Sequence, residues 1–173
     1  ETIDMRAVYD ALPQAMKERI EGLEAEHSYF HSRRKAGAPV DMDEARANNP
    51  AFPYLHAVQP MVRTSANGRK TLFLGAHAYA VVGMEPEEGT ALIEELLAFA
   101  CQPRFIYAHT WRQGDVLIWD NRCALHRGTE FDYEKYKRDL RRANVNESGE
   151  DCYAIPAGLG FESAMKAMPA KAG

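Results

Sequence analysis

The most informative stretch of the sequence runs Trp119-Asp120-Asn121-Arg122-Cys123-Ala124-Leu125-His126-Arg127-Gly128. It begins at the end of a compact apolar run, Val116-Leu117-Ile118-Trp119, which is typical of a buried strand. His126 lies seven residues after Trp119, the last residue of this run. An imidazole in that place is either a structural histidine with its hydrogen bonds made within the protein, or a metal ligand. The second role is open because neutral histidine is the commonest metal ligand among side chains.

A pair of arginines, Arg138 and Arg142, follows His126 by 12 and 16 residues. Residues four apart lie on the same face of a strand as well as of a helix, so both side chains can point to one side. The planar guanidinium suits carboxylates because it forms two charge-assisted hydrogen bonds at once. The alternative is a solvated charged face, since Lys135, Lys137 and Arg141 lie in the same stretch.

Secondary structure around this stretch is expected to be mixed. Asp4 is placed to cap a short helix through Leu12, and a further apolar stripe at helical spacing continues to Leu23. Acidic residues from Glu85 onward favour the first turn of a longer helix that ends near Cys101. The sequence therefore predicts helices at the start and in the middle of the chain.

Strands are predicted on either side of turn signals. Residues 60–64 and 71–74 flank Asn67-Gly68, a dipeptide suited to a tight hairpin turn, and residues 104–110 alternate between apolar and polar. The stretch from Ser32 to Pro53 is polar and rich in Pro, Asn and charge, and is expected to be a long connection without structure of its own.

Composition limits the class of protein. A chain of 173 residues with 46% hydrophobic and 27% charged residues can bury the core of one soluble domain. The net charge of -4 is spread along the chain, which disfavours nucleic-acid binding. No apolar run is long enough to span a bilayer. The cysteines Cys101, Cys123 and Cys152 lie far apart and are expected to be free thiols, so we expect a cytoplasmic protein.

The decisive motifs, W-D-N-R-x-x-x-H followed by R-x-x-x-R, resemble the last metal histidine and the carboxylate-binding arginines of the taurine dioxygenase and 2,4-dichlorophenoxyacetate dioxygenase family. These enzymes depend on Fe(II) and 2-oxoglutarate. The resemblance extends to about Asn146, and further segments are similar to the herbicide-cleaving branch in the same order: Asp4 to Pro13, Ala25 to His27, Val62 to Thr64, Gly68 to Lys70, and Gly75 to Ala78.

The resemblance implies a double-stranded β-helix, that is, a cupin-like jelly roll that is mainly β with flanking helices. Residues 1–162 would be the C-terminal part of this domain, and residues 163–173 a flexible tail. By the same resemblance, His126 would bind Fe(II), Arg138 the distal carboxylate of 2-oxoglutarate, and Arg142 and His77 the substrate. O2 would be the second cosubstrate.

The sequence departs from the family in its spacing and in its metal ligands. Arg138 follows His126 by one residue more than in the family, although only Arg138 keeps Arg142 as a partner four residues away. No histidine has an Asp or Glu two residues later, so the H-x-D or H-x-E pair that supplies the family's first two metal ligands is absent from this sequence. His27 and His31 are four apart and could face one way on a helix, but without an accompanying carboxylate we do not expect a metal there. His77 has an alternative role as a strand-end histidine bonded to the backbone.

The expected function is hydroxylation of a small anionic substrate by an oxidoreductase whose remaining ligands lie outside these residues. An aryloxyalkanoate with cleavage of its ether bond is favoured, and a taurine-like sulfonate comes next. No nucleic-acid or membrane partner is expected, and a homo-oligomer is possible. The alternative is a jelly-roll remnant that binds an anion or a partner without catalysis, because the H-x-D pair is absent.

Overall fold

The computed structural model describes residues 1–39, 41, 43, 47–48 and 56–143. Strands outnumber helices among the described elements, so this part of the chain is mainly β with few helices. The elements are β1 (Thr2–Asp4), α1 (Met5–Ala11), α2 (Gln14–Ile20), β2 (Glu24–Ser28), α3 (Tyr29–Lys35), β3 (His56–Pro60), β4 (Val62–Thr64), β5 (Lys70–Leu72), β6 (Ala78–Val81), α5 (Pro86–Ala100), the 3-10 helix η2 (Pro103–Phe105), β7 (Ile106–Tyr107) and β8 (Ala124–His126).

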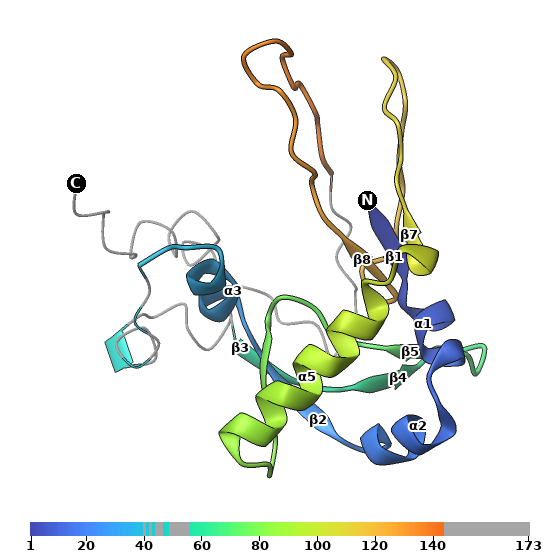
Figure 1. The fold of residues 1–173 in the computed structure, drawn as a ribbon, viewed down its shortest axis with the longest axis vertical. Helices are drawn as coiled ribbons and strands as arrows, with labels where there is room; N and C mark the ends of the chain where they lie inside the picture. The colour runs from blue at the N-terminus through green and yellow to red at the C-terminus, as the bar shows by residue number, and fades with distance from the viewer. Residues whose placement is uncertain (40, 42, 44–46, 49–55, 144–173) are drawn as a thin grey trace.

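The strands form three small sheets in which all pairs are antiparallel. β1 lies between β7 and β8, β2 lies between β3 and β6, and β4 pairs with β5. The first strand of the chain is therefore bonded to its last described strand, and the N-terminus lies beside the base of β8 (Figure 1).

The predicted N-terminal helix is confirmed. Asp4 is its N-cap, and the carboxylate accepts a hydrogen bond of 2.9 Å from the backbone N–H of Arg6. Leu12 is the C-cap, and Pro13 takes the cap position of α2 rather than its first turn. Proline suits this place because it has no N–H to leave unpaired at the start of a helix.

The predicted hairpin and the predicted central helix are also confirmed. β4 and β5 are joined through Asn67-Gly68, and Gly68 has a φ of 80°, a left-handed conformation that glycine adopts without strain. α5 ends at Ala100 with Cys101 as its C-cap. It packs closely on β6, because a Cβ atom on Gly89 would lie 3.0 Å from the backbone nitrogen of Val81.

A single hydrophobic core joins the N-terminal helices, the sheets and α5. Its most deeply buried side chains come from segments far apart in the sequence: Met5, Val8, Ile20, Met61, Leu72, Leu92 and Leu96. The body is thus stabilised by apolar burial without any contribution from the long segments on either side of β8.

Those two segments are long arms that extend away from the body (Figure 1). We call residues 108–123 the first arm and residues 127–143 the second arm. Neither contains an assigned strand, so the prediction of a buried strand at Val116-Leu117-Ile118-Trp119 is wrong for the described structure. Val116 is 83% exposed and Ile118 88% exposed, because no other segment of the described chain covers them.

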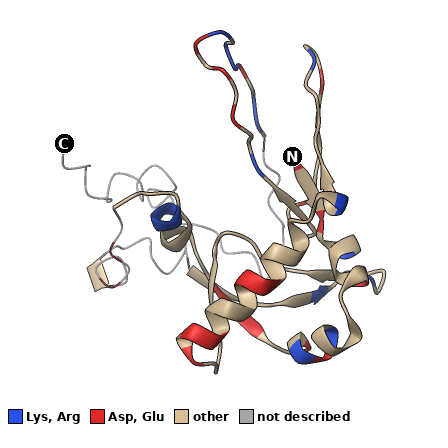
Figure 2. Cartoon of the chain, in the orientation of Figure 1, with Lys and Arg blue, Asp and Glu red and all other residues tan. Residues whose placement is uncertain are grey.

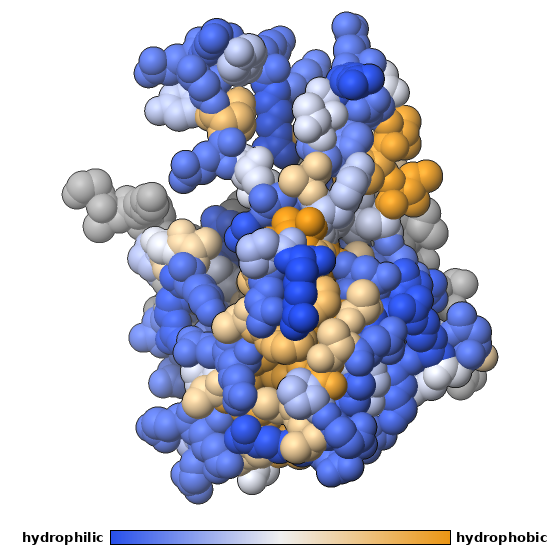
Figure 3. All heavy atoms as spheres, turned by 45° about the vertical axis from the view of Figure 1, so that its right-hand side comes forward, coloured by the Kyte–Doolittle hydropathy of each residue, from blue (hydrophilic) through white to orange (hydrophobic). Residues whose placement is uncertain are grey.

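The apolar side chains of the arms remain at the surface (Figure 3). Among the described residues, most of the exposed large hydrophobic side chains belong to the arms: Trp111, Val116, Ile118, Phe131, Tyr133, Tyr136 and Leu140. Exposed apolar patches of this kind mark surfaces that another segment or partner covers.

The expectation of an unstructured connection after Ser32 is wrong at its start, because α3 continues to Lys35 and its Ser28 cap accepts a hydrogen bond from His31 N–H. Within that connection, residues 40, 42, 44–46 and 49–53 lie outside the described residues, as do the tail at 163–173 and Cys152. Cys101 and Cys123 are free thiols, as predicted. In the described part, no helix is both long and apolar enough to cross a bilayer.

Candidate functional site

His126 is the last residue of β8 and lies opposite Thr2 of β1. The strand is fixed on both sides of this histidine: Arg127 N–H donates to the Glu1 carbonyl at 3.0 Å, and Met5 N–H donates to the Cys123 carbonyl at 2.8 Å. The residue is exposed rather than enclosed. β8 therefore holds the histidine backbone rigidly while leaving part of the imidazole accessible.

The residues before β8 form a turn that sets the direction of the strand. The Asp120 carbonyl accepts from the backbone N–H groups of Cys123 and Ala124 at 3.1 and 2.9 Å. The Asp120 carboxylate accepts from the N–H and Nε of Arg122, and this guanidinium holds the pKa of Asp120 below its usual value. The W-D-N-R motif is thus a structural turn at the entrance to the histidine strand.

Trp119 packs directly against His126, with ring centroids 4.8 Å apart and an interplanar angle of 47°. Its indole N–H donates to Asn121 Oδ1 at 2.9 Å, which orients the ring. Burial lowers the pKa of His126, and the positive charges of Arg142 and of the N-terminus lower it further. A lowered pKa favours the neutral imidazole, which is the form that binds a metal.

The second arm brings one of the two predicted arginines toward His126. Arg142 is close enough for its charge to lower the pKa of the imidazole. Arg138 lies nearer the tip, with its guanidinium 5.8 Å from the Phe131 ring and 3.6 Å from where a Cβ on Gly128 would be. Within the described residues neither arginine forms an ion pair.

His77 lies between β5 and β6, and its carbonyl accepts from Ser28 N–H at 2.8 Å. Its ring stacks on Tyr29 at 6.3 Å, and the surrounding protein lowers its pKa by desolvation. The same loop reaches β8, because a Cβ on Gly75 would lie 3.2 Å from Leu125 Cδ2. The structure therefore connects the segment of His77 to the strand of His126, whereas substrate binding by His77 stays a prediction.

The remaining metal ligands are absent from the described residues. No group of three His, Cys, Asp or Glu side chains among them could hold a metal ion. His27 and His31 do not share a helix face, because His27 belongs to β2 and His31 to α3. The histidines of the described chain thus supply one candidate ligand, His126, and no complete centre.

Two polar arrangements on the sheet of β2 were not predicted from sequence. Glu26 Oε2 accepts from Tyr79 Oη at 2.5 Å and contacts His56 Nε2 at 3.0 Å, which links the three strands of that sheet. On the same strand, Nε2 of His27 is buried and has no hydrogen-bond partner among the described residues. Alternation along β2 gave no signal for either, because both depend on side chains from β3 and β6.

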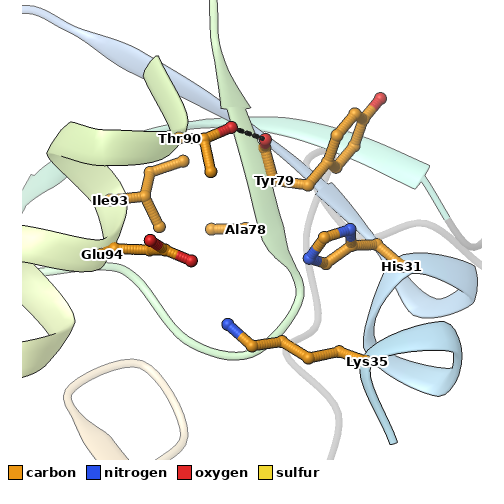
Figure 4. A pocket seen from close by; sticks show the side chains of 7 residues that line it. All are labelled: His31, Lys35, Ala78, Tyr79, Thr90, Ile93 and Glu94. Carbon is orange, nitrogen blue, oxygen red and sulfur yellow. Dashed lines mark hydrogen bonds between the residues drawn. The ribbon is translucent and has the colours of Figure 1, made fainter. Parts of the chain in front are cut away.

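A cavity of about 130 Å³ opens between α3, β6 and α5 (Figure 4). Ala78 and Ile93 are buried at its base, and Lys35 and Glu94 extend toward it from opposite sides. The charges follow the helices, since basic residues gather on α3 and acidic ones on α5 (Figure 2). None of the predicted site residues lines this cavity, so it is separate from the site at His126.

Comparison with known proteins places this geometry in context. Residues 1–144 match the family model described as "Taurine catabolism dioxygenase TauD, TfdA family". The chain is 44% identical over 159 residues to an alpha-ketoglutarate-dependent 2,4-dichlorophenoxyacetate dioxygenase of Burkholderia sp. (strain RASC), covering 91% of this chain and 51% of that protein. It is 42% identical over 134 residues to an (S)-phenoxypropionate/alpha-ketoglutarate-dioxygenase of Sphingobium herbicidovorans, covering 75% of this chain and 46% of the relative.

A solved structure supports the same comparison. The crystal structure of AAD-2 in complex with Mn(II) and N-oxalylglycine superimposes with a TM-score of 0.71 at 37% identity, covering 81% of this chain and 54% of that one. The chain spans about half the length of the curated relatives it matches.

Proposed function

The chain belongs to the TauD, TfdA family of dioxygenases, and from this premise we propose that it is the C-terminal part of an Fe(II)- and 2-oxoglutarate-dependent enzyme that hydroxylates a small anionic substrate. One observation carries the proposal: His126 is fixed at the end of β8 by backbone hydrogen bonds on both sides, and its exposed ring packs against Trp119. The imidazole of His126 can bind a metal ion, and the guanidinium of Arg142 can bind the carboxylate of a ligand held near that ion.

The residues present fit part of such a centre. His126 is the one metal ligand that the described residues offer, and an iron site of this type needs a second imidazole and a carboxylate. We assign those ligands to polypeptide outside this chain, which spans about half of its relatives. When bound, iron with 2-oxoglutarate and O2 supplies the hydroxylation of a C–H bond, with release of succinate and CO2.

The chain's own residues would bind and orient the two organic anions. Arg138 would hold the distal carboxylate of 2-oxoglutarate and Arg142 the acidic group of the substrate, since each guanidinium can form a bidentate pair with a carboxylate. His77 would line the substrate pocket from the loop that touches β8 through Gly75. The exposed state of both arginines in this chain supports their availability to ligands.

An aryloxyalkanoate is the substrate class that we favour. The named relatives act on 2,4-dichlorophenoxyacetate and (S)-phenoxypropionate. Hydroxylation of the carbon next to the ether oxygen gives a hemiacetal, which collapses by breaking the carbon–oxygen bond to release a phenol and a carbonyl acid. A non-catalytic remnant is the less favoured alternative, because the relatives that match most of this chain are named as dioxygenases.

We also propose that residues 1–162 form the C-terminal part of a double-stranded β-helix, whose remainder would correspond to the half of the relatives that this chain does not span. The first arm supports this, because two side chains of its apolar run Val116-Leu117-Ile118-Trp119, those of Val116 and Ile118, are exposed among the described residues. A strand that is apolar on both faces is suited to burial on both sides.

The test compares Fe(II) affinity and succinate formation in three proteins: the 173-residue chain, the complete protein and its His126→Ala variant. The isolated chain should bind Fe(II) weakly and form no succinate, and His126→Ala should abolish turnover of the complete protein. A His31→Ala variant is the matched control, because its ring stacks on Tyr79 at 5.5 Å. Wild-type affinity and turnover in His126→Ala would refute the assignment.

A further inference from the structure

His27 carries a buried nitrogen for which the described protein provides no partner. The residue lies in β2, the central strand of its sheet, and its ring is 5.7 Å from that of Phe73. Its Nε2 is buried and without a hydrogen bond among the described residues. Buried polar atoms are nearly always paired, so an orphan of this kind calls for a ligand or another partner.

The backbone at His27 is irregular in a way that bears on where its side chain points. The pairing of β2 with β6 shifts register between Glu26 and His27. Bulges of this type re-aim side chains and are over-represented beside active sites. The irregularity is independent of the unpaired nitrogen, and both observations concern the same side chain.

His27 also adjoins the segment proposed to bind substrate. Ser28, its neighbour, donates its N–H to the His77 carbonyl at 2.8 Å. The loop of His77 in turn contacts β8 through Gly75 and Leu125, one residue before His126. These contacts therefore link the strand of His27, through the loop that holds Gly75 and His77, to the proposed metal strand.

The charge state of His27 restricts what it can recognise. Burial lowers its pKa to about 4, and repulsion from His77 and His56 adds to the effect. The ring is neutral near pH 7, so it offers a hydrogen bond but no net charge. It is therefore suited to an uncharged polar atom of a ligand, whereas the carboxylate is left to Arg142.

We propose that His27 contacts the substrate and selects for an ether oxygen, donating a hydrogen bond from Nε2–H to that atom. An ether oxygen only accepts, so the ring must carry its proton on Nε2. The inference rests on the proposed function and adds to it a residue that distinguishes aryloxyalkanoates from carbon analogues of the same shape and charge.

The experiment uses the complete protein with Fe(II) and 2-oxoglutarate under anaerobic conditions. Dissociation constants are measured for 2,4-dichlorophenoxyacetate and for 3-(2,4-dichlorophenyl)propanoate, in which CH2 replaces the ether oxygen. His27→Phe should weaken binding of the ether acid by about threefold to tenfold, the range of one hydrogen bond, and leave the carbon analogue within about twofold. His109→Phe is the control and should leave the ratio unchanged, because both ring nitrogens of His109 already have partners, in Tyr107 and Asp115.

A second measurement follows the imidazole directly and does not depend on the variant folding. The 15N shift of His27 Nε2 should change on adding the ether acid and stay constant with the carbon analogue. Turnover with no such change, or equal weakening of both ligands in His27→Phe, would overturn the inference alone. If the 15N shift changes with the ether acid alone but the protein does not turn over 2-oxoglutarate, the proposed function is overturned and the inference stands. If neither the shift change nor turnover is seen, both are overturned.

Discussion

Gly75 and Leu125 approach so closely that a Cβ atom on Gly75 would lie 3.2 Å from Leu125 Cδ2. This contact joins the loop of His77 to the strand of His126 across a separation of about fifty residues in sequence. Because the neighbour is the end of a flexible side chain, a small shift of Leu125 can relieve a single added methyl group. A branched side chain would have to move the loop as well.

Gly75→Val should therefore destabilise the protein by about 1–3 kcal/mol, the usual cost of overpacking, whereas Gly75→Ala should cost less. Ala76→Val is the matched control, because Ala76 is the next residue and is exposed. Urea unfolding of the three variants measures the effect. Equal stabilities for Gly75→Val and Ala76→Val would mean that the loop does not rest on β8.

Trp119 should act as a positioning residue for His126, since their ring centroids are 4.8 Å apart. Removing a group that orients a metal ligand typically costs about tenfold to a hundredfold in metal affinity. We expect Trp119→Ala to weaken Fe(II) binding of the complete protein in this range, and Trp119→Phe to restore most of it. Trp111→Ala is the control, because Trp111 packs on His109 at 4.7 Å; an equal loss there would point to general destabilisation.

Acid should destabilise the chain partly through His27. Its folded pKa of about 4 lies below the ordinary value of 6.5, so the unfolded state binds more protons between these values. The contribution is complete above pH 6.5 and is lost as the pH falls toward 4. Between pH 7.5 and 5 it amounts to roughly 2 kcal/mol for a shift of this size.

The measurement is urea unfolding of the wild type and His27→Gln at both pH values. The variant should lose less stability on acidification, by about 2 kcal/mol. The lowered pKa values of His31, His77 and His126 act in the same direction and remain in both proteins, so they cancel in the comparison. Identical pH dependence in the two proteins would show that His27 titrates normally.

The local elements were predictable because their signals are local. A capping Asp4, the Asn67-Gly68 turn and the periodic apolar face of α5 each act within a few residues, and all three elements form as expected. Burial of Val116 was not predictable in the same way. An apolar run indicates that a segment is suited to burial, but whether it is buried depends on a neighbouring segment, and none of the described residues covers Val116.

The same distinction between local and tertiary signals applies to the residues of the candidate site. The motif identified His126 and the pair Arg138 and Arg142, whereas His27 received no binding role because its sequence neighbours carry no ligand pattern. Its unpaired nitrogen arises from packing between β2, β6 and Phe73, which are distant in sequence. Tertiary burial of a polar atom has no periodic signature, so only the structure reveals it.

Arg138 and Arg142 should have separable roles. They are four residues apart, about 13 Å if that segment is extended at roughly 3.3 Å per residue. Arg142 is near enough to His126 to lower its pKa, while Arg138 lies beside Phe131 and Gly128 farther along the arm. Two guanidiniums at different distances from the metal histidine are expected to meet different carboxylates.

Arg138→Ala in the complete protein should raise the 2-oxoglutarate requirement on the order of a hundredfold, because a charged ligand group loses its partner in a covered site, with much less change in substrate affinity. Arg142→Ala should do the reverse and leave decarboxylation of 2-oxoglutarate uncoupled from substrate oxidation. Arg141→Ala, next to Arg142 in the chain, is the control and should alter neither. If both main variants shift only the 2-oxoglutarate dependence, Arg142 is not the substrate clamp. If neither variant shifts any constant, the two arginines belong to a solvated charge run. The extra residue between His126 and Arg138 would then mean that another residue binds the carboxylate of 2-oxoglutarate, and Lys137 would be the first to test.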